Sequence, residues 1–254
     1  MTDLEILSKF SSSDVEKAVQ TYWKKESKFA RRQAKKSRLF IVGGLRGSRT
    51  DIKAYEIYRN LYKDCVIIDY DKMRNLHPNA KKIYKKGAIN SSDFFEYSDE
   101  FARQIYKNIV NKTLENGYNT VIVSDFYAEF QTQHFAKFEK YEKNLILLAG
   151  KKKNCDSGEA IRYYYEWVDF ETKHSKKVPL KFPKSYLKNS SENFVPNCEK
   201  IVEKLDFKTI EIFYINLYLR KRLIFKDDKI DLNKIKEILN RAIFFKNAKK
   251  VVKI

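Results

Sequence analysis

Residues 39–50 read Leu-Phe-Ile-Val-Gly-Gly-Leu-Arg-Gly-Ser-Arg-Thr, and this stretch decides the fold class that the chain is expected to have. It begins with a short apolar run that ends in glycine, which is typical of a strand buried in a parallel sheet. Helical periodicity starts directly after the glycine-rich loop. A strand, a glycine-rich loop and a helix in this order predict a phosphate-binding loop, because backbone N–H groups and the positive end of the helix both face the anion.

The loop matches the phosphate-binding consensus GxxxxGK[ST] only in part. Gly43 and Thr50 occupy its first and last positions, while Ser48 replaces the second glycine and Arg49 replaces the lysine. Arginine keeps the positive charge but presents a planar fork, so it would hold phosphate oxygens in a different geometry. The residues expected to bind phosphate are Gly43, Gly44, Gly47, Ser48, Arg49 and Thr50. The alternative is an ordinary glycine-rich turn between a strand and a helix.

Three more apolar runs have the character of buried strands, and segments with helical periodicity separate them. The strands are expected at 65–69, 120–123 and 145–149. The helices are expected at 50–62, 98–115 and 129–142. Strands that alternate with helices indicate βαβ crossovers, so we predict an α/β fold with a mostly parallel sheet flanked by helices. Ligands in such folds bind beyond the carboxyl ends of the strands.

Additional elements are expected at both ends of the chain. A capping box at Ser13 and Glu16 predicts an amphipathic basic helix that runs to about Lys36. A further strand is expected at 210–215, pairing with a short strand at 223–225, before a last helix from about residue 231. We therefore predict three parts, which are a basic helical extension (1–38), an α/β domain (39–226) and a C-terminal helix packed on the domain (227–254).

The composition is that of a folded protein. Of the 254 residues 43% are hydrophobic, and only 7 Gly and 4 Pro are present, which excludes disordered and collagen-like proteins. Three scattered cysteines match neither a disulfide framework nor a zinc site. The sequence shows no signal-peptide pattern and no apolar run long enough to span a bilayer, so we expect a cytoplasmic location and no membrane partner.

The strong positive charge has two interpretations. The sequence holds 52 Lys+Arg against 33 Asp+Glu, a formal net charge of +19. Such an excess attracts phosphates of any kind, or it only solvates the protein surface. The basic residues gather at 24–38 and 220–254. The aromatic residues available there for base stacking are Trp23, Phe29, Phe244 and Phe245. Their helical spacing favours positions in the core, so nucleic acid is an unlikely partner.

Two carboxylates follow the second predicted strand, in the stretch Ile67-Ile-Asp-Tyr-Asp-Lys-Met-Arg-Asn-Leu-His-Pro78. Asp69 and Asp71 lie just past the carboxyl end of a parallel strand. A carboxylate at that edge can deprotonate a substrate hydroxyl or hold a metal ion. The alternative is that both residues only cap the following turn.

Two later motifs complete a family resemblance. They are Glu115-Asn-Gly-Tyr-Asn-Thr-Val-Ile-Val123 and Ser157-Gly-Glu-Ala-Ile-Arg-Tyr163. Together with the glycine-rich loop and the Asp69 to Pro78 stretch, they make residues 39–226 resemble the zeta toxin family of P-loop kinases. The resemblance implies a P-loop kinase-like fold and transfer of the γ-phosphate of ATP, with Mg²⁺, to a hydroxyl of UDP-N-acetylglucosamine or a related nucleotide sugar. It also implies an antitoxin protein as a partner.

The resemblance implies roles for individual residues. Asp71 matches the catalytic base, Arg49 stands at the position of the phosphate-binding lysine, and Thr50 matches the hydroxyl that binds Mg²⁺. Arg162 matches an arginine that reaches the nucleotide phosphates from a later helix, although it could be only a solvated helix charge. The residues expected to contact the substrate are Asp69, Arg74, Asp125 and Lys177.

The chain departs from the family pattern after the third strand. The family has Glu-Gly-Thr-Gly-Arg there, whereas this chain has Val123-Ser-Asp-Phe-Tyr127. The acidic, hydroxyl and basic contacts are missing at their positions, and Asp125 is the candidate replacement for the acid. Three hypotheses remain open, which are a zeta-toxin-like phosphotransferase, a catalytically impaired pseudo-kinase that binds a nucleotide or a protein, and a basic nucleic-acid-binding protein.

Overall fold

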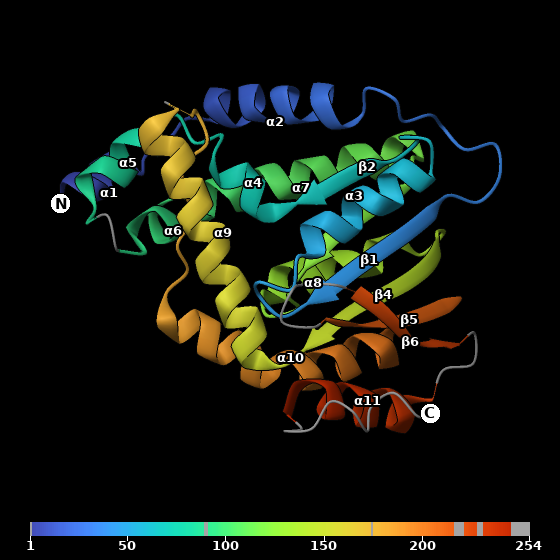
Figure 1. The fold of residues 1–254 in the computed structure, drawn as a ribbon. Coiled ribbons are helices and arrows are strands. Elements are labelled where there is room, and N and C mark those ends of the chain that lie inside the picture. The colour runs from blue at the N-terminus through green and yellow to red at the C-terminus, as the bar shows by residue number, and fades with distance from the viewer. Residues whose placement is uncertain (1, 89–90, 174, 216–220, 228–230, 245–254) are drawn as a thin grey trace.

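A six-stranded sheet runs through the centre of the computed structural model (Figure 1). The structure describes residues 2–88, 91–173, 175–215, 221–227 and 231–244. The strand order is β2-β3-β1-β4-β5-β6, and only the β5–β6 pair is antiparallel. The strands are β1 (Arg38–Gly44), β2 (Val66–Asp69), β3 (Thr120–Ser124), β4 (Glu142–Gly150), β5 (Thr209–Ile215) and β6 (Lys221–Asp227). The predicted α/β fold with a mostly parallel sheet is confirmed.

The parallel register brings the carboxyl ends of three strands to one edge of the sheet. Gly43 of β1 lies beside Ser124 of β3, and Asp69 of β2 lies beside Val123. The inner strands are apolar on both faces, since helices cover both. The glycine-rich loop and the stretch after Asp69 therefore leave the sheet side by side, where the sequence predicted a ligand site.

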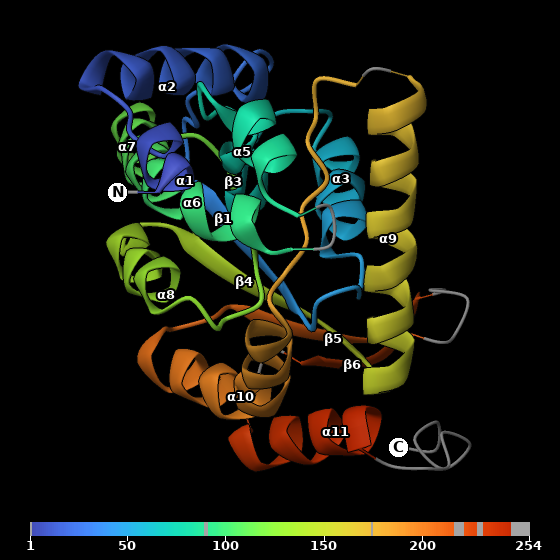
Figure 2. The ribbon, with the colours of Figure 1, turned by 90° about the vertical axis from the view of Figure 1, so that its left-hand side faces the viewer.

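Each face of the sheet has its own hydrophobic cluster. On one face α3 (Thr50–Asn60) buries Ala54 and Ile57 against the sheet. Besides Tyr70 and Met73 of α4 (Tyr70–Arg74), Cys155 of α9 (Lys152–Thr172) and Phe138, the larger cluster on the other face joins the sheet to five α-helices. These are α2 (Ser12–Glu26), α7 (Asp99–Asn116), α8 (Glu129–Phe135), α10 (Lys184–Lys204) and α11 (Leu232–Phe244). Figure 2 shows α3 and α7 on opposite sides of the sheet.

A third cluster lies beyond the carboxyl edge of the sheet. It packs α5 (Ala80–Lys86) and α6 (Asp93–Tyr97) against Phe170 and the segment 178–182. Phe170 belongs to α9 (Lys152–Thr172), which stands beside α3 in Figure 2. The remaining short helices are α1 (Asp3–Leu7), α4 (Tyr70–Arg74) and the 3₁₀ turn η1 (Ala136–Phe138). None of the helices within the described residues is long and apolar enough to cross a membrane.

Two predicted helices are shorter than the sequence suggested. The helix expected to reach Lys36 ends at Glu26, because the apolar periodicity stops at Tyr22 and the following backbone finds other partners. The Arg31 N–H donates to Asp64 Oδ1 at 2.7 Å, for example. The capping box is Ser11 with Asp14, two residues earlier than predicted. The helix expected at 129–142 ends as α8 at Phe135, since β4 already begins at residue 142.

The predictions for the C-terminal region are confirmed where the structure describes it. β5 and β6 form the expected antiparallel pair, and α11 begins directly after Asp231. Ile238 and Leu239 of α11 are buried in the larger cluster. Residues 245–254, which belong to the basic segment 220–254, lie outside the described residues. The division of the chain into three parts stays a prediction.

Helix α2 holds the end of β2 through a single hydroxyl group. Tyr22 is 5% exposed, and its hydroxyl donates to the Ile67 carbonyl at 3.1 Å and accepts from the Asp69 N–H at 3.0 Å. β2 is the outermost described strand on this side of the sheet. Tyr22 therefore satisfies two backbone groups at the end of the strand that leads into Asp71, the predicted catalytic base.

The substitution Tyr22→Phe tests this link. Loss of the hydroxyl leaves the Ile67 carbonyl and the Asp69 N–H buried without that partner, which costs about 1–3 kcal/mol. We expect urea unfolding to show a free energy of unfolding lowered by that amount. The control is Tyr62→Phe, because Tyr62 is 90% exposed, and it should change stability by less than about 0.5 kcal/mol. Equal stabilities of the two variants would show that Tyr22 does not fix β2.

Candidate active site

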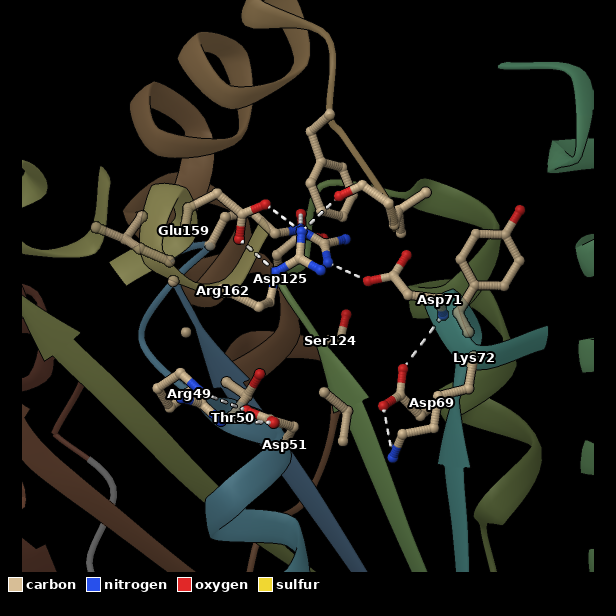
Figure 3. Close-up of a pocket in the computed structure, with 18 of the residues that line it drawn as sticks. Arg49, Thr50, Asp51, Asp69, Asp71, Lys72, Ser124, Asp125, Glu159 and Arg162 are labelled. Atoms are coloured by element: carbon tan, nitrogen blue, oxygen red, sulfur yellow. Dashed lines mark hydrogen bonds and ion pairs between the residues drawn. The ribbon is translucent and has the colours of Figure 1, made fainter. Parts of the chain in front are cut away.

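A pocket opens at the carboxyl edge of the sheet (Figure 3). Its walls come from the glycine-rich loop, the start of α4, the end of β3, helix α9 and the segment 177–182. The predicted site residues that line it are Gly44, Gly47, Arg49, Thr50, Asp69, Asp71, Asp125, Arg162 and Lys177. Gly43, Ser48 and Arg74 do not line it. Residues from five separate stretches of sequence thus meet at one site.

The loop after β1 makes a tight turn and leads directly into α3. The Ser48 N–H donates to the Leu45 carbonyl at 2.9 Å and closes a tight turn. Gly47 has a φ of 80°, a conformation that glycine adopts at little cost. Arg49 is the N-cap of α3, and no side chain of the described residues caps that end. The Ile52 N–H donates to the Arg49 carbonyl at 3.2 Å, so the N–H groups of Thr50 and Asp51 are the ones that an anion could bind.

Gly47 also fixes the distance between the loop and α9. A Cβ at this position would lie 1.9 Å from the Cys155 carbonyl oxygen. Only a residue without a side chain lets the loop backbone approach the helix so closely.

Gly43 and Ser48 support the loop from beneath. A Cβ on Gly43 would lie 2.0 Å from Cζ of Phe126, whose ring is buried under β1. The Ser48 hydroxyl is buried and has no hydrogen-bond partner among the described residues. It would lie 2.4 Å from a Cβ on Gly44. Neither Gly43 nor Ser48 lines the pocket in this conformation. The Ser48 hydroxyl therefore does not reach a ligand there.

Arg49 is paired with its neighbour Asp51. Its Nε and Nη2 lie 3.1 and 3.2 Å from Oδ1 and Oδ2 of Asp51 (Figure 3). Burial raises the pKa of Asp51, but the Arg49 guanidinium outweighs it and holds that pKa below its usual value. Arg49 therefore lies at the lysine position of the consensus with its charge already balanced.

Arg162 is fixed in the pocket wall by two carboxylates. It donates to Glu159 at 3.0 and 2.5 Å, to Glu166 at 2.6 Å and to the Leu180 carbonyl at 2.6 Å. Burial lowers the pKa of Arg162, yet Glu159 and Glu166 raise it above the ordinary value. The interpretation of Arg162 as a solvated helix charge is therefore wrong. Lys177 binds the same Glu166 at 2.5 Å.

The two carboxylates after β2 have different surroundings. Asp69 is the N-cap of α4, where its Oδ1 accepts from the Asp71 N–H at 3.2 Å. Its Oδ2 lies 3.0 Å from Lys72 Nζ. The capping alternative thus holds for Asp69, which shapes the turn that presents Asp71. The Asp71 side chain itself projects into the pocket (Figure 3).

Asp71 pairs with Arg46, a residue that the sequence analysis did not select. Arg46 Nη1 binds Asp71 Oδ2, and its Nε lies 2.8 Å from Asp125 Oδ2. Burial raises the pKa of Asp71, but Arg46 and then Arg74 outweigh it and hold that pKa below the usual range. Asp71 is therefore a carboxylate at neutral pH. The sequence does place Arg46 inside the glycine-rich loop. That loop was expected to lie beside the stretch with Asp69 and Asp71, since both follow parallel strands.

Helix α10 adds a further partner to Arg46. Tyr186 accepts from Arg46 Nη2 at 3.2 Å and donates to Asp125 Oδ2 at 2.9 Å. The guanidinium also lies 4.2 Å from the centre of the Phe182 ring. Arg46 thus joins the loop after β1 to α4, to the end of β3 and to α10.

Arg74 lies beneath the pocket. It is 1% exposed and donates to the Phe95 carbonyl at 2.7 Å and to Asp99 at 2.5 Å. Its guanidinium lies 4.1 Å from the centre of the Phe95 ring. In this conformation Arg74 cannot touch a substrate, and it supports α4 from below, with its Nε 3.7 Å from Asp71 Oδ1.

The pocket lining does not share the excess of basic residues that gives the chain a net charge of +19, because its acidic side chains outnumber its basic ones by one. The basic side chains of its lining are Arg46, Arg49, Lys72, Arg162 and Lys177. Each of them forms an ion pair with an acidic residue of the same lining. A phosphate ligand therefore has to compete with carboxylates for these cations.

The pocket offers few groups that could hold a ligand without displacing an ion pair. The start of α3 has no side-chain cap, and such a helix start can bind an anion. Within the described residues, no group of three or more His, Cys, Asp or Glu side chains could hold a metal ion. The Thr50 hydroxyl lies at the pocket, where it could share a Mg²⁺ ion with phosphate oxygens.

Comparison with known proteins gives the family. The family model described as zeta toxin matches residues 20–237, which is most of the chain. The chain belongs to the zeta toxin family. A zeta toxin of Streptococcus agalactiae is 26% identical over 133 residues, which are 51% of this chain and 45% of that toxin. The matched stretch thus spans less than half of that relative's length.

Solved structures share the zeta toxin fold of this chain. A chain from the PezAT chromosomal toxin–antitoxin system of Streptococcus pneumoniae superposes with a TM-score of 0.72 at 18% identity, covering 97% of this chain and 94% of that one. A chain of AvrRxo1-ORF1:-ORF2 with ATP gives a TM-score of 0.54 at 9% identity, covering 93% and 72%. These two likenesses show the fold alone. The family resemblance and the P-loop kinase-like fold predicted from the motifs are confirmed.

The substitution Gly47→Ala tests the packing of the loop. The new Cβ would meet the Cys155 carbonyl and would also force alanine into a positive φ, so we expect the free energy of unfolding to fall by about 2–4 kcal/mol. Gly117→Ala is the matched control, because Gly117 also has a positive φ, of 62°, but a Cβ there would make only ordinary van der Waals contacts, at 3.7 Å or more, with Arg32 and Ser37. It should cost only about 1 kcal/mol. Similar losses in thermal or urea unfolding would argue against a close contact at Gly47.

Proposed function

We propose that this member of the zeta toxin family transfers the γ-phosphate of ATP to a hydroxyl group of a nucleotide sugar resembling UDP-N-acetylglucosamine. One observation carries the proposal. The Asp71 carboxylate and the glycine-rich loop line the same pocket and are joined through Arg46. A general base and a phosphate-binding loop side by side are the minimum that phosphoryl transfer needs, since positioning and electrostatics supply most of its catalysis.

The residues of the pocket have separate roles in this proposal. ATP would supply the phosphoryl group, and Mg²⁺ would screen the charge of its phosphates. Asp71 accepts the proton of the acceptor hydroxyl as the new oxygen–phosphorus bond forms and ADP leaves. Arg49 and Arg162 neutralise charge on the transferred group, and the Thr50 hydroxyl holds the metal ion. Asp69 orients Asp71 through its bond to the Asp71 N–H.

We propose a class of acceptor, the nucleotide sugars, rather than one compound, because the residues after β3 differ from the family pattern. Phe126 and Tyr127 stand where the family pattern has Gly-Arg. Phe126 is buried against Phe194, and the Tyr127 ring packs on Tyr186. Asp125 and Lys177 remain as polar candidates for contacts with the acceptor. A changed set of contacts predicts a changed choice among nucleotide sugars.

A pseudo-kinase is the second candidate, and the paired cations favour it. Every basic side chain among the described lining residues already has a carboxylate partner, which weakens the attraction for ATP. In this candidate the chain binds a nucleotide or a protein without turnover. An antitoxin is the proposed protein partner in both candidates, because the PezAT chain belongs to a toxin–antitoxin system.

The nucleic-acid hypothesis has less support. Trp23 is stacked on Tyr118 with ring centres 5.7 Å apart, so it is not free to stack on a base. Phe29 is 47% exposed and remains available. Phe245 and the side chain of Phe244 lie outside the described part of the chain.

A phosphotransfer assay tests the proposal. The protein is incubated with ATP, Mg²⁺ and a panel of nucleotide sugars, and phosphorylated products are detected by mass spectrometry. We expect a product from at least one of them, and Asp71→Asn should reduce its rate by about 10²–10⁴-fold, as expected for loss of a general base.

The matched control is Asp169→Asn. Asp169 lies on α9 and pairs with Lys173 at the surface, with 53% of its side chain exposed, so the rate should not change. Absence of any product, together with ATP binding detected by calorimetry, would favour the pseudo-kinase. Equal rates for the two variants would remove Asp71 from the proposed mechanism.

A further inference from the structure

Arg46 occupies one oxygen of Asp71 in the conformation of the structure. Oδ2 is bound by Arg46 Nη1. Oδ1 is buried and accepts no hydrogen bond from any described residue. A general base must lie within hydrogen-bond reach of the proton that it takes. An acceptor hydroxyl would therefore have to compete with Arg46 for Oδ2 of the proposed catalytic base.

Arg46 comes from the loop that is expected to bind phosphate. It lies between Gly44 and Gly47, two of the glycines that line the pocket. A phosphate chain seated on this loop would therefore lie within reach of the same guanidinium that holds Asp71. Guanidinium groups bind phosphate through paired N–H donors in the same way as they bind carboxylates. A bound phosphate and the Asp71 carboxylate would thus compete for the Arg46 guanidinium.

We propose that Arg46 is a phosphate-responsive latch on the catalytic base: a polyphosphate chain bound to the glycine-rich loop takes the guanidinium from Asp71 and leaves the carboxylate open to the acceptor hydroxyl. The latch consists of Arg46, Asp71, Asp125 and Tyr186. This proposal rests on the function proposed above for the same pocket. It adds that the chain couples donor binding to activation of the base.

The exchange leaves no partner of the latch without a compensating group. Arg46 moves from carboxylates to phosphate and stays paired with an anion throughout. Asp71 keeps Arg74 Nε at 3.7 Å from its Oδ1. Asp125 keeps the hydrogen bond from the Tyr186 hydroxyl at 2.9 Å. Breaking a buried ion pair is costly mainly when one charge remains unpaired. The exchange is therefore least costly if Arg46 Nε stays on the Asp125 carboxylate while its Nη1 turns from Asp71 to phosphate.

The charged and titratable groups around Asp71 set its proton affinity, so a change in that affinity can show whether Arg46 has left. They are Arg46 in the loop, Arg74 in α4, Arg162 in α9, Asp125 at the end of β3 and Tyr186 in α10. Arg46 is the group that binds an oxygen of Asp71 and also belongs to the proposed phosphate site. Its departure should therefore raise the proton affinity of Asp71, whereas Arg74 acts on both states alike.

The test is the titration of the Asp71 side chain by NMR, with ¹³C-labelled aspartate and assignment through Asp71→Asn. Inorganic tripolyphosphate serves as the probe, so no phosphoryl acceptor is involved. In the wild-type protein, saturating tripolyphosphate should raise the proton affinity of Asp71 by about tenfold or more, since an opposite charge at close range has an effect of that size.

Variants of the two loop arginines separate the latch from a general effect of charge. Arg46→Met should raise the proton affinity of Asp71 without tripolyphosphate, and adding the probe should then change it much less than in the wild-type protein. Arg49→Met removes the same charge from the same loop but away from Asp71, and it should leave the titration of the free protein unchanged. Arg46→Lys should lie between wild type and Arg46→Met. Apart from Asp71→Asn, which is needed for the assignment, the wild-type measurement needs no variant to fold.

Two results would overturn the latch. One is an Asp71 titration that is the same in free and tripolyphosphate-saturated wild-type protein. The other is a failure of millimolar tripolyphosphate to bind at all in calorimetry. Neither depends on turnover. A shift of Asp71 without any phosphorylated product would leave the latch standing and remove the transferase proposal, and turnover without the shift would do the reverse.

Discussion

The parallel pairing of β1 and β2 with β3 between them is the constraint on which the rest of the site depends. Parallel strands end at the same edge of a sheet, so the loop after β1, the turn after β2 and the residues after β3 are forced together. Tyr22 of α2 fixes the outer member of this group through the backbone of β2. The helices that follow these strands then add side chains to a site whose position the carboxyl ends of the strands already define.

Electrostatic balance is the second property of the site. The chain has a large positive charge, yet the cations of the pocket are matched by carboxylates that come from the same walls. Such pairing keeps buried arginines in place without a ligand, because an unpaired buried charge is far more costly than a paired one. It also means that any affinity for phosphate would have to arise from exchange of partners. The net charge of the chain therefore indicates little about the ligand, whereas the arrangement of the ion pairs in the pocket indicates more.

The fold could be predicted from the sequence in its main features, since buried parallel strands and amphipathic helices leave strong patterns. The end of α2 could not, because hydrogen bonds such as that of the Arg31 N–H to Asp64 depend on a residue distant in the sequence. Asp71 and the loop were found through their motifs. Arg46 was missed because its importance comes from Asp125 and Tyr186, which only the folded chain brings to it. Arg74 was expected to contact the substrate, because its motif alone does not reveal that Asp99 and Phe95 enclose it in the folded chain.

We propose that one loop both holds the donor phosphates and controls the base beside them. A crystal structure with a non-hydrolysable ATP analogue and Mg²⁺ would test this coupling. We expect the phosphate chain on residues 44–50, the guanidinium of Arg46 on a phosphate oxygen, and Asp71 open to the pocket. An analogue bound elsewhere, or bound on the loop with Arg46 still on Asp71, would contradict it.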